Sequence, residues 1–476
     1  MAKTLFFYDV ETSGISAAYQ RILQFAGQRT SLDLKPIGQP VNWLVKLTED
    51  VLPEPEAILV HGISPQRTRV EGMSEADFSR RITSEIFTID TIAIGYNNIR
   101  FDDEFIRFTL WRNFHDPYEW HWADGRGRWD LLDVARMMRA LRPEGLKWSF
   151  DEAGQPVNRL VNLAEANAID ISKAHDALAD VNTTIELARL IRAAQPKLFG
   201  YLFGLRDKRS VERLVAEAKP FVYTSGRYSS DNLKTTVALM LANHPNESGA
   251  VLVYDLRFDP KPFVDLSAAQ LANLIYVPYA DRDKIAPLPV KKLALNRAPA
   301  VAPLSTLDKP SMKRIKLSSE LIDANLAALR KAEGFVERVS EAFATQKMPK
   351  RQDADGRLYD GFISDADKQL LGQVRAAGAD ELADLQPSFG DERLTTLLLR
   401  YKARNFPEAL SAEEQVKWES WRQDKLLNGV DNSLTLALFG QRLAERAATP
   451  GLSDANKFLL EEVKLWGESI APASLF

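Results

Sequence analysis

The chain contains no cysteine. This absence excludes disulfide bonds, zinc sites built from thiolates and catalysis by a cysteine nucleophile, and it fits a reducing compartment. The sequence also lacks any run of about 20 apolar residues, the length that a membrane-spanning helix needs. At its start no basic leader precedes a long apolar stretch, so we expect no signal peptide. Together these absences favour a cytoplasmic protein with no membrane attachment.

Neither sign of charge is in strong excess, because 61 Lys and Arg face 65 Asp and Glu and the net charge is −4. Any binding of nucleic acid must therefore come from locally basic surface. The sequence has no Gly-x-x-x-x-Gly-Lys-Ser/Thr loop, which argues against a nucleotide-driven motor. It also has no internal repeats or long low-complexity tracts.

A chain of 476 residues is too long for one ordinary core, and its pattern changes twice. Residues 1–195 alternate strand-like and helical segments, which predicts an α/β domain. Residues 196–346 indicate a mainly β domain, and residues 349–476 have the amphipathic spacing of a helical domain. In the first domain we expect two strands and three helices, at Thr4–Asp9 and Ile92–Gly95 and at Asp103–Trp111, Leu131–Leu141 and Ala177–Ala194.

Four short apolar segments of the middle domain are bounded by Gly, Asn, Asp or Pro, which predicts strands. They cover residues 221–228, 235–242, 249–256 and 273–280. The segment 281–316 contains five prolines, nine Lys or Arg and three Asp, so we expect it to be locally basic and a poor helix. In the last domain, helical spacing is clearest over 413–427 and 456–470.

Two carboxylates stand at the end of the first expected strand. Asp9 and Glu11 are two positions apart, and residues i and i+2 of a strand point to the same face. Carboxylates this close raise each other's pKa unless a cation neutralises them. Sets of oxygen ligands favour hard cations such as Mg²⁺ or Mn²⁺. The alternative is a solvated turn after the strand, because an isolated Asp-x-Glu is common.

A second acidic pair opens the helix that follows Ile92–Gly95. Asp102 and Asp103 come directly after Asn98-Ile99-Arg100-Phe101. Asp102 can join a shared carboxylate site, or either aspartate can simply cap the helix, a frequent role for Asp.

A third patch precedes the helix Ala177–Ala194. His175 and Asp180 are five residues apart, which on a regular helix places them about 140° apart. They can face one site only if His175 lies in the loop before the helix and Asp180 lies on its first turn or two. A single histidine is otherwise more often an ordinary surface or core residue.

The order Asp-x-Glu, Asn-x-x-Phe-Asp, His-x-x-x-x-Asp resembles that of the DEDDh exonuclease superfamily. Within it, the chain is similar to bacterial exonuclease I in the segments GYNNIRFDDEF, RNFHDPYEW, RWDLLDVARMMRALRPEGL, AHDALADVNTTIELARLI, LYDGFISDADK and YKARNFP. The resemblance covers nearly the whole chain and is weakest between about residues 225 and 345. It implies a ribonuclease H-like exonuclease domain (1–195), an SH3-like domain (196–346) and a helical C-terminal domain (349–476), which enclose a groove for single-stranded DNA.

The resemblance implies Mg²⁺-dependent 3′→5′ hydrolysis of single-stranded DNA to nucleoside 5′-monophosphates, in DNA repair and recombination. It implies two Mg²⁺ ions, for which Mn²⁺ can substitute, held by Asp9, Glu11, Asp102 and Asp180. Asp9 is then the bridge, Glu11 and Asp180 are direct ligands, and Asp102 acts through water; Glu11 also lies beside the substrate. His175 is the expected general base that takes a proton from the attacking water.

Between residues 107 and 130, basic and aromatic side chains alternate, as binding of single-stranded DNA requires. The resemblance implies DNA contacts at Arg107, Tyr118, Trp122, Arg136 and Arg159. Trp111 and Trp129 lie beside helical patterns and are expected in the core. The remaining histidines have no metal-ligand spacing and are expected to be ordinary residues; they are His61, His115, His121 and His244.

The resemblance further implies a protein partner, the acidic and apolar C-terminal tail of single-stranded DNA-binding protein. Arg142 and Tyr201 match positions of the pocket for this tail, whereas Ala302–Lys309 departs from the family pattern. We expect the enzyme to be a monomer.

Two alternatives belong to other classes. Other DEDDh enzymes, such as proofreading subunits or RNA-trimming nucleases, are typically single compact domains and would leave about 280 residues of this chain without a purpose. A catalytically dead DNA-binding scaffold is disfavoured because such a relative would be free to lose the acidic quartet and His175.

Overall fold

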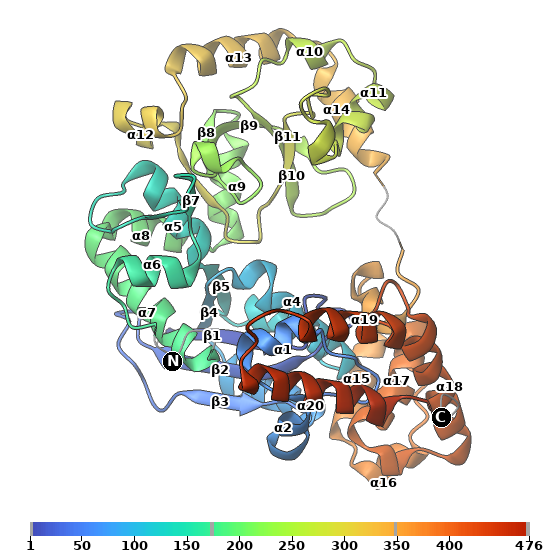
Figure 1. Ribbon diagram of the computed structural model, residues 1–476. Helices are drawn as coiled ribbons and strands as arrows, with labels where there is room; N and C mark the ends of the chain where they lie inside the picture. Colours follow the sequence, from blue (N-terminus) through green and yellow to red (C-terminus); the bar gives the residue numbers. More distant parts are fainter. Residues whose placement is uncertain (1–2, 172–175, 347–349, 473–476) are drawn as a thin grey trace. The chain divides into compact units, whose positions relative to one another are not determined.

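The structure is a computed structural model that describes residues 3–171, 176–346 and 350–472. The chain forms two compact units, drawn in Figure 1. Unit 1 consists of Met1–Gly127, Ser172–Asn182 and Lys350–Phe476, and unit 2 consists of Arg128–Ile171 and Thr183–Pro349. Within the described residues, no helix is long and apolar enough to cross a membrane.

In unit 1, neighbouring strands of the sheet follow the order β3–β2–β1–β4. Its central strand β1 (Thr4–Thr12) pairs antiparallel with β2 (Ile22–Thr30) and parallel with β4 (Thr91–Gly95). β3 (Val41–Leu44) pairs antiparallel with β2. The chain passes from unit 1 into unit 2 within β5 (Gly127–Asp130), directly after Gly127.

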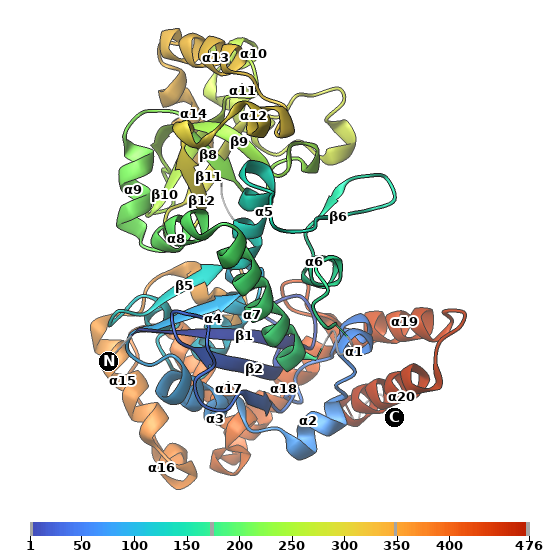
Figure 2. The ribbon, with the colours of Figure 1, turned by 90° about the vertical axis from the view of Figure 1, so that its left-hand side faces the viewer.

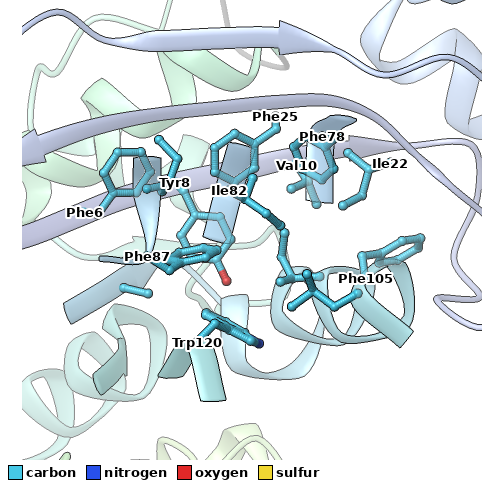
Figure 3. Packing of buried hydrophobic residues seen from close by; sticks show 14 of the residues in the cluster. Phe6, Tyr8, Val10, Ile22, Phe25, Phe78, Ile82, Phe87, Phe105 and Trp120 are labelled. Carbon is cyan, nitrogen blue, oxygen red and sulfur yellow. The ribbon is translucent and has the colours of Figure 1, made fainter. Parts of the chain in front are cut away.

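One face of β1 contributes to a hydrophobic core of unit 1. Phe6, Tyr8 and Val10 are buried in a cluster with Phe25 and Trp120, as Figure 3 shows. Because side chains alternate along a strand, Asp9 and Glu11 point to the other face. The first part of unit 1 also contains α1 (Pro55–His61), α2 (Pro65–Glu71), α3 (Glu75–Arg81), the π-helical turn Ile82–Ile86, α4 (Asp102–Arg112) and the 3₁₀ helices Asn98–Arg100 and Glu119–His121.

The C-terminal part of unit 1 is helical, as expected. It contains α15 (Asp365–Ala376), α16 (Ala379–Asp384), α17 (Glu392–Asn405), α18 (Ala412–Asn428), α19 (Leu436–Ala447), α20 (Asp454–Ile470) and the 3₁₀ helices Ala354–Asp360 and Pro407–Ala409. Hydrogen bonds join this part to the first 127 residues. The indole of Trp466 on α20 donates to the Val51 carbonyl at 3.0 Å, and the indole of Trp111 on α4 donates to the Ala354 carbonyl at 2.9 Å.

Unit 2 is built around an antiparallel sheet with the order β11–β10–β9–β8–β12. The strands are β8 (Phe221–Thr224), β9 (Thr235–Asn243), β10 (Ala250–Asp255), β11 (Val290–Ala294) and β12 (Ala300–Pro303), and a small hairpin pairs β6 (Ser149–Phe150) with β7 (Pro156–Val157). In Figure 2, α14 (Phe335–Ala344) lies beside the sheet and beside α11 (Ala268–Ile275).

The helices of unit 2 follow the sequence pattern closely in its first part, where α5 (Leu131–Leu141) has the expected bounds. The helix α7 (Ala177–Ala194) also has the expected bounds and passes from unit 1 into unit 2. The others are α6 (Leu160–Ala166), α8 (Pro196–Gly204), α9 (Lys208–Ala216), α10 (Lys261–Val264), α11 (Ala268–Ile275), α12 (Lys309–Arg314), α13 (Ser319–Lys331), α14 (Phe335–Ala344) and the 3₁₀ helices Ser230–Asn232, Tyr279–Asp281 and Leu304–Thr306.

The expected strand over 273–280 is wrong. Its first residues end the helix α11, and a 3₁₀ helix follows at Tyr279–Asp281. Ser267 and Gln270 form a reciprocal capping box that starts α11, and such a cap outweighs the strand preference of a short apolar run. The fourth and fifth strands of the sheet lie instead in the proline-rich basic segment, as β11 and β12.

Candidate active site

The strand β1 presents Asp9 and Glu11 on the face opposite the aromatic core. Both residues are only partly exposed, whereas their neighbours Tyr8 and Val10 are buried. The pairing of β1 with β2 shifts register between Glu11 and Thr12. The strand therefore ends directly after its second carboxylate.

Asp180 joins the two carboxylates of β1 from the first turn of α7. Its N–H donates to the Asp176 carbonyl at 3.0 Å, and the Asp176 side chain accepts from the Ala179 N–H at 3.1 Å. One oxygen from each of Asp9, Glu11 and Asp180 lies within 4.8 Å of the others. Three carboxylates at this spacing could hold a metal ion.

The electrostatics of this cluster call for a cation. Burial, then the charges of Asp102, Glu11 and Asp180, raises the pKa of Asp9 well above its ordinary value. Burial, then the charges of Asp180, Asp102 and Asp176, raises the pKa of Glu11 to about 8. A divalent cation would relieve this repulsion, and the all-oxygen donor set suits a hard ion.

Asp102 lies next to this cluster but outside the group of three. It is 4 % exposed, and its Oδ1 accepts a hydrogen bond from the Val10 N–H at 3.1 Å. Asp102 is thus attached to the residue between Asp9 and Glu11, and its charge raises the pKa of both.

Behind Asp102, the next residue is held by Tyr8, which the sequence pattern did not single out, and by Asn98, the first residue of the Asn-x-x-Phe-Asp motif. The Tyr8 hydroxyl donates to Asp103, and so does the side-chain amide of Asn98, at 3.1 Å. Burial, then the charges of Asp103 and Asp102, raises the pKa of Tyr8 well above its ordinary value. Strand periodicity could have shown only that Tyr8 faces the core.

His175, the expected general base, lies outside the described residues. His61 lies near the end of β1, where its Nε2 contacts the Thr12 carbonyl at 3.1 Å and its Nδ1 accepts from the Ile63 N–H at 3.0 Å.

The expected DNA contacts of unit 1 divide into exposed and buried side chains. Trp122 is 63 % exposed, and Tyr118 is half-buried beside Phe362. Arg107 is 5 % exposed and is bound to Glu104 at 3.0 Å, to the Tyr359 hydroxyl at 3.3 Å and to His121 at 2.9 Å. Its guanidinium also lies 5.5 Å from the centre of the Tyr118 ring.

Trp111 and Trp129 are each 1 % exposed, which confirms that they lie in the core as expected. In unit 2, Arg136 binds Asp133 at 2.7 Å, and a Cβ built at Gly226 would lie 3.0 Å from its Nη1. Arg159 is exposed at the N-cap of α6.

The two residues of the expected peptide pocket are also in unit 2. Arg142 binds the carbonyls of Leu141 at 2.6 Å and Thr306 at 3.0 Å, and its Nη1 lies 3.3 Å from the Asp308 carboxylate. Tyr201 is 37 % exposed, and partial burial raises its pKa to about 12.

Models of three protein families match the chain. "Exonuclease" matches residues 6–188, "Exonuclease I SH3-like domain" matches residues 206–345, and "Exonuclease I C-terminal domain" matches residues 352–470. Exodeoxyribonuclease I of Haemophilus influenzae is 40% identical over 428 residues, which cover 89% of this chain and 90% of that protein. The Escherichia coli enzyme of the same name is 40% identical over 424 residues, covering 88% and 89%.

Solved structures agree with these matches. Exonuclease I of Methylocaldum szegediense has a TM-score of 0.94 and 40% identity, covering 99% of this chain and 100% of that one. E. coli exonuclease I in complex with a dA16 oligonucleotide has a TM-score of 0.94 and 36% identity, covering 98% and 100%. The zinc-bound form of an E. coli exonuclease I complex with single-stranded DNA has a TM-score of 0.93 and 36% identity, covering 99% and 100%.

The fold and the carboxylate face define a ribonuclease H-like exonuclease, an enzyme that carries an SH3-like and a helical C-terminal domain besides its catalytic one. The chain belongs to the exonuclease I family. The fold class expected from the sequence is thereby confirmed.

Proposed function

We propose that this enzyme removes nucleoside 5′-monophosphates from the 3′ end of single-stranded DNA in a Mg²⁺-dependent reaction. The convergence of Asp9, Glu11 and Asp180 within 4.8 Å carries this proposal. A cluster whose burial and repulsion raise the pKa of its carboxyls gains most by binding a cation. The relatives of known structure that bind oligonucleotides and zinc support the choice of substrate and of a divalent metal.

The residues have separate roles in this reaction. Asp9, Glu11 and Asp180 would hold two Mg²⁺ ions, or Mn²⁺ in their place, with Asp102 acting through water. When bound, the cations would activate the attacking water and stabilise the leaving oxygen. His175 would take the proton of that water as its oxygen bonds to phosphorus. The bond from phosphorus to the 3′ oxygen breaks, and this oxygen takes a proton from solvent water to become the 3′-hydroxyl of the shortened strand.

We assign the DNA contacts to aromatic and basic side chains that differ in exposure. The exposed Trp122 and the half-buried Tyr118 offer ring faces on which bases stack, and Arg136 and Arg159 contact phosphates. Arg107 acts on DNA through Tyr118, since its guanidinium lies over that ring. Domain bounds of 1–195, 196–346 and 349–476 are part of this proposal.

The partner proposal rests on the family resemblance at Arg142 and Tyr201. These residues would receive the acidic C-terminal tail of single-stranded DNA-binding protein, which brings the enzyme to coated DNA in repair and recombination. The monomeric state and the cytoplasmic location remain predictions of the sequence.

The decisive experiment uses oligonucleotides labelled at either end, single- and double-stranded, with Mg²⁺ or with chelator. We expect loss of mononucleotides from the 3′ end of single strands with Mg²⁺ alone. The Asp9→Ala variant should lose at least about 90% of the rate, because loss of a metal ligand costs several kcal/mol of barrier, while it still binds DNA. Equal activity in chelator, or release from the 5′ end, would refute the proposal.

A further inference from the structure

The two faces of β1 serve different purposes. Asp9 and Glu11 lie on one face, and Tyr8 lies on the other, where it is 2 % exposed. The Tyr8 ring packs against Phe25 and Phe87, with ring centres 5.8 and 5.9 Å apart. Figure 3 shows its hydroxyl, in red, as the polar end of a side chain otherwise surrounded by apolar groups.

That hydroxyl holds a buried carboxylate. Tyr8 and Asn98 both donate to Oδ1 of Asp103, and Asn98 and Asp103 are each fully buried. The close fit of Asn98 depends on Gly95, because a Cβ at position 95 would lie 2.7 Å from the Asn98 Cβ and 3.1 Å from the Tyr8 carbonyl. The end of β4 is thus shaped to admit the Asn98 side chain.

The first turn of α4 connects this carboxylate to the active site. Asp102 and Asp103 are consecutive, so on the helix their side chains point about 100° apart. Asp103 reaches Tyr8 on the core side of β1, while Asp102 accepts the Val10 N–H. The start of α4 is therefore attached to β1 at two points, which fixes its rotation about the helix axis.

We propose that Tyr8 and Asn98 are positioning residues that hold Asp103, fix the first turn of α4 and thereby place the Asp102 carboxylate beside the Asp9 and Glu11 site. The inference rests on the proposed function, since it requires Asp102 to take part in metal-dependent hydrolysis. Both groups that donate to Asp103, the Tyr8 hydroxyl and the Asn98 amide, are neutral, and this neutrality matters beside a cation site. A Lys or Arg in place of Tyr8 would also hold Asp103, but its charge would compete with the cation for the neighbouring carboxylates.

The test removes one atom, with Tyr8→Phe. A hydrogen bond to a buried charge contributes strongly to the position of the charged group, so its loss should displace Asp103 and with it Asp102. We therefore expect kcat to fall about ten-fold, with KM for single-stranded DNA unchanged. In calorimetric titration of the DNA-free protein with Mn²⁺ alone, the dissociation constant should rise about five-fold or more. The matched control is Tyr254→Phe, which removes another buried hydroxyl, bound to the Phe258 carbonyl in unit 2, and should change neither quantity.

A second variant separates positioning from stability. Tyr8→Phe leaves the buried Asp103 charge with one donor fewer, so its melting temperature should fall. In Tyr8→Phe/Asp103→Asn this charge is removed, so the melting temperature should return to the wild-type value while kcat and Mn²⁺ affinity stay low. Recovery of all three would show that the contact only stabilises the fold and would overturn the inference. Should Tyr8→Phe fail to fold, the double variant carries the same prediction.

The outcome also distinguishes this inference from the proposed function. Wild-type Mn²⁺ binding that Asp9→Ala abolishes and Tyr8→Phe leaves intact overturns only the positioning role. Absence of Mn²⁺ binding by the wild type refutes the proposed metal site, and the inference with it.

Discussion

The guanidinium of Arg142 is already engaged by groups of its own chain. It lies 3.3 Å from the Asp308 carboxylate, which also caps α12 by accepting the Ser311 N–H at 2.8 Å. A peptide that ends in a carboxylate would need the same guanidinium. Asp308 therefore competes with the proposed tail for Arg142.

We expect Arg142→Ala to weaken binding of a labelled acidic tail peptide about ten-fold or more, since a hydrogen bond to a charged group contributes about 1.5–3 kcal/mol. Asp308→Asn keeps the helix cap, because Asn caps as well as Asp, and should tighten binding about two- to five-fold, the worth of an exposed ion pair. Fluorescence anisotropy measures both. Asp365→Asn, at a fully exposed side chain, controls for net charge, and weaker binding by Asp308→Asn would contradict the competition.

A second residue-scale prediction concerns acid stability. Burial, together with the nearby charge of Arg375, lowers the pKa of His115 to about 3, whereas a histidine in the unfolded chain has a pKa of about 6.5. Between these values the unfolded chain binds a proton that the folded chain does not, so the free energy of unfolding falls as pH drops from about 6.5 towards 3. His115→Gln should flatten this dependence in urea denaturation at a series of pH values. An unchanged slope would show that His115 does not contribute to it.

At the scale of elements, local hydrogen bonds in the turn around the 3₁₀ helix Glu119–His121 determine which aromatic rings are buried and which are exposed. Asp116 accepts the N–H groups of Tyr118 and Glu119 at 2.8 and 3.0 Å. Trp120 is 2 % exposed and donates its indole N–H to the Pro117 carbonyl at 3.1 Å. Because Trp120 takes the buried position in this turn, Trp122 remains exposed.

We therefore expect the Tyr118→Ala/Trp122→Ala variant to bind single-stranded DNA more weakly by about 1–3 kcal/mol per lost stacked base, with little dependence on base sequence. Filter binding with homopolymers measures this loss. Phe458→Ala on α20, which removes a ring of similar exposure at 64 %, should bind as the wild type does. Equal affinity of the double variant would mean that neither ring stacks on DNA.

At the scale of the whole molecule, a buried network of charges joins distant parts of unit 1. Arg404 on α17 contacts Asp50 at 2.8 Å and Asp355 at 2.5 Å, and Lys425 on α18 contacts Asp50 at 2.7 Å. Burial alone would raise the pKa of Asp355, but Arg404 and Arg400 hold it well below its usual range. The network ties the C-terminal helices to the segment that follows β3.

Asp355→Asn should lower the free energy of unfolding by about 3–5 kcal/mol, because it leaves buried positive charge uncompensated. Urea denaturation followed by tryptophan fluorescence measures the loss. Asp365→Asn, the exposed control, should stay within about 0.5 kcal/mol of the wild type. A comparably small effect of Asp355→Asn would mean that water or rearrangement compensates the network.

The sequence pattern predicted the structure correctly wherever the spacing of residues along one helix or strand determines it. Strand alternation put Asp9 and Glu11 on one face, and helix spacing predicted the bounds of α5 and α7. It failed at 273–280, where a capping box decided between helix and strand. It also could not find β11 and β12, because both strands are short and lie among prolines and basic residues, and because their partners β10 and β8 are far away along the chain.

By itself, then, the sequence determined which carboxylates are available and on which elements they stand, because periodicity is a local property of the backbone. Only the tertiary structure decided which groups hold them. The bond from Tyr8 to Asp103 joins residues 95 positions apart, and that from Arg404 to Asp50 joins residues 354 apart. Arg107, one of several basic residues in an aromatic stretch, became a buried residue bound to Glu104 and Tyr359. Such pairings depend on how elements pack, which no spacing along the chain encodes.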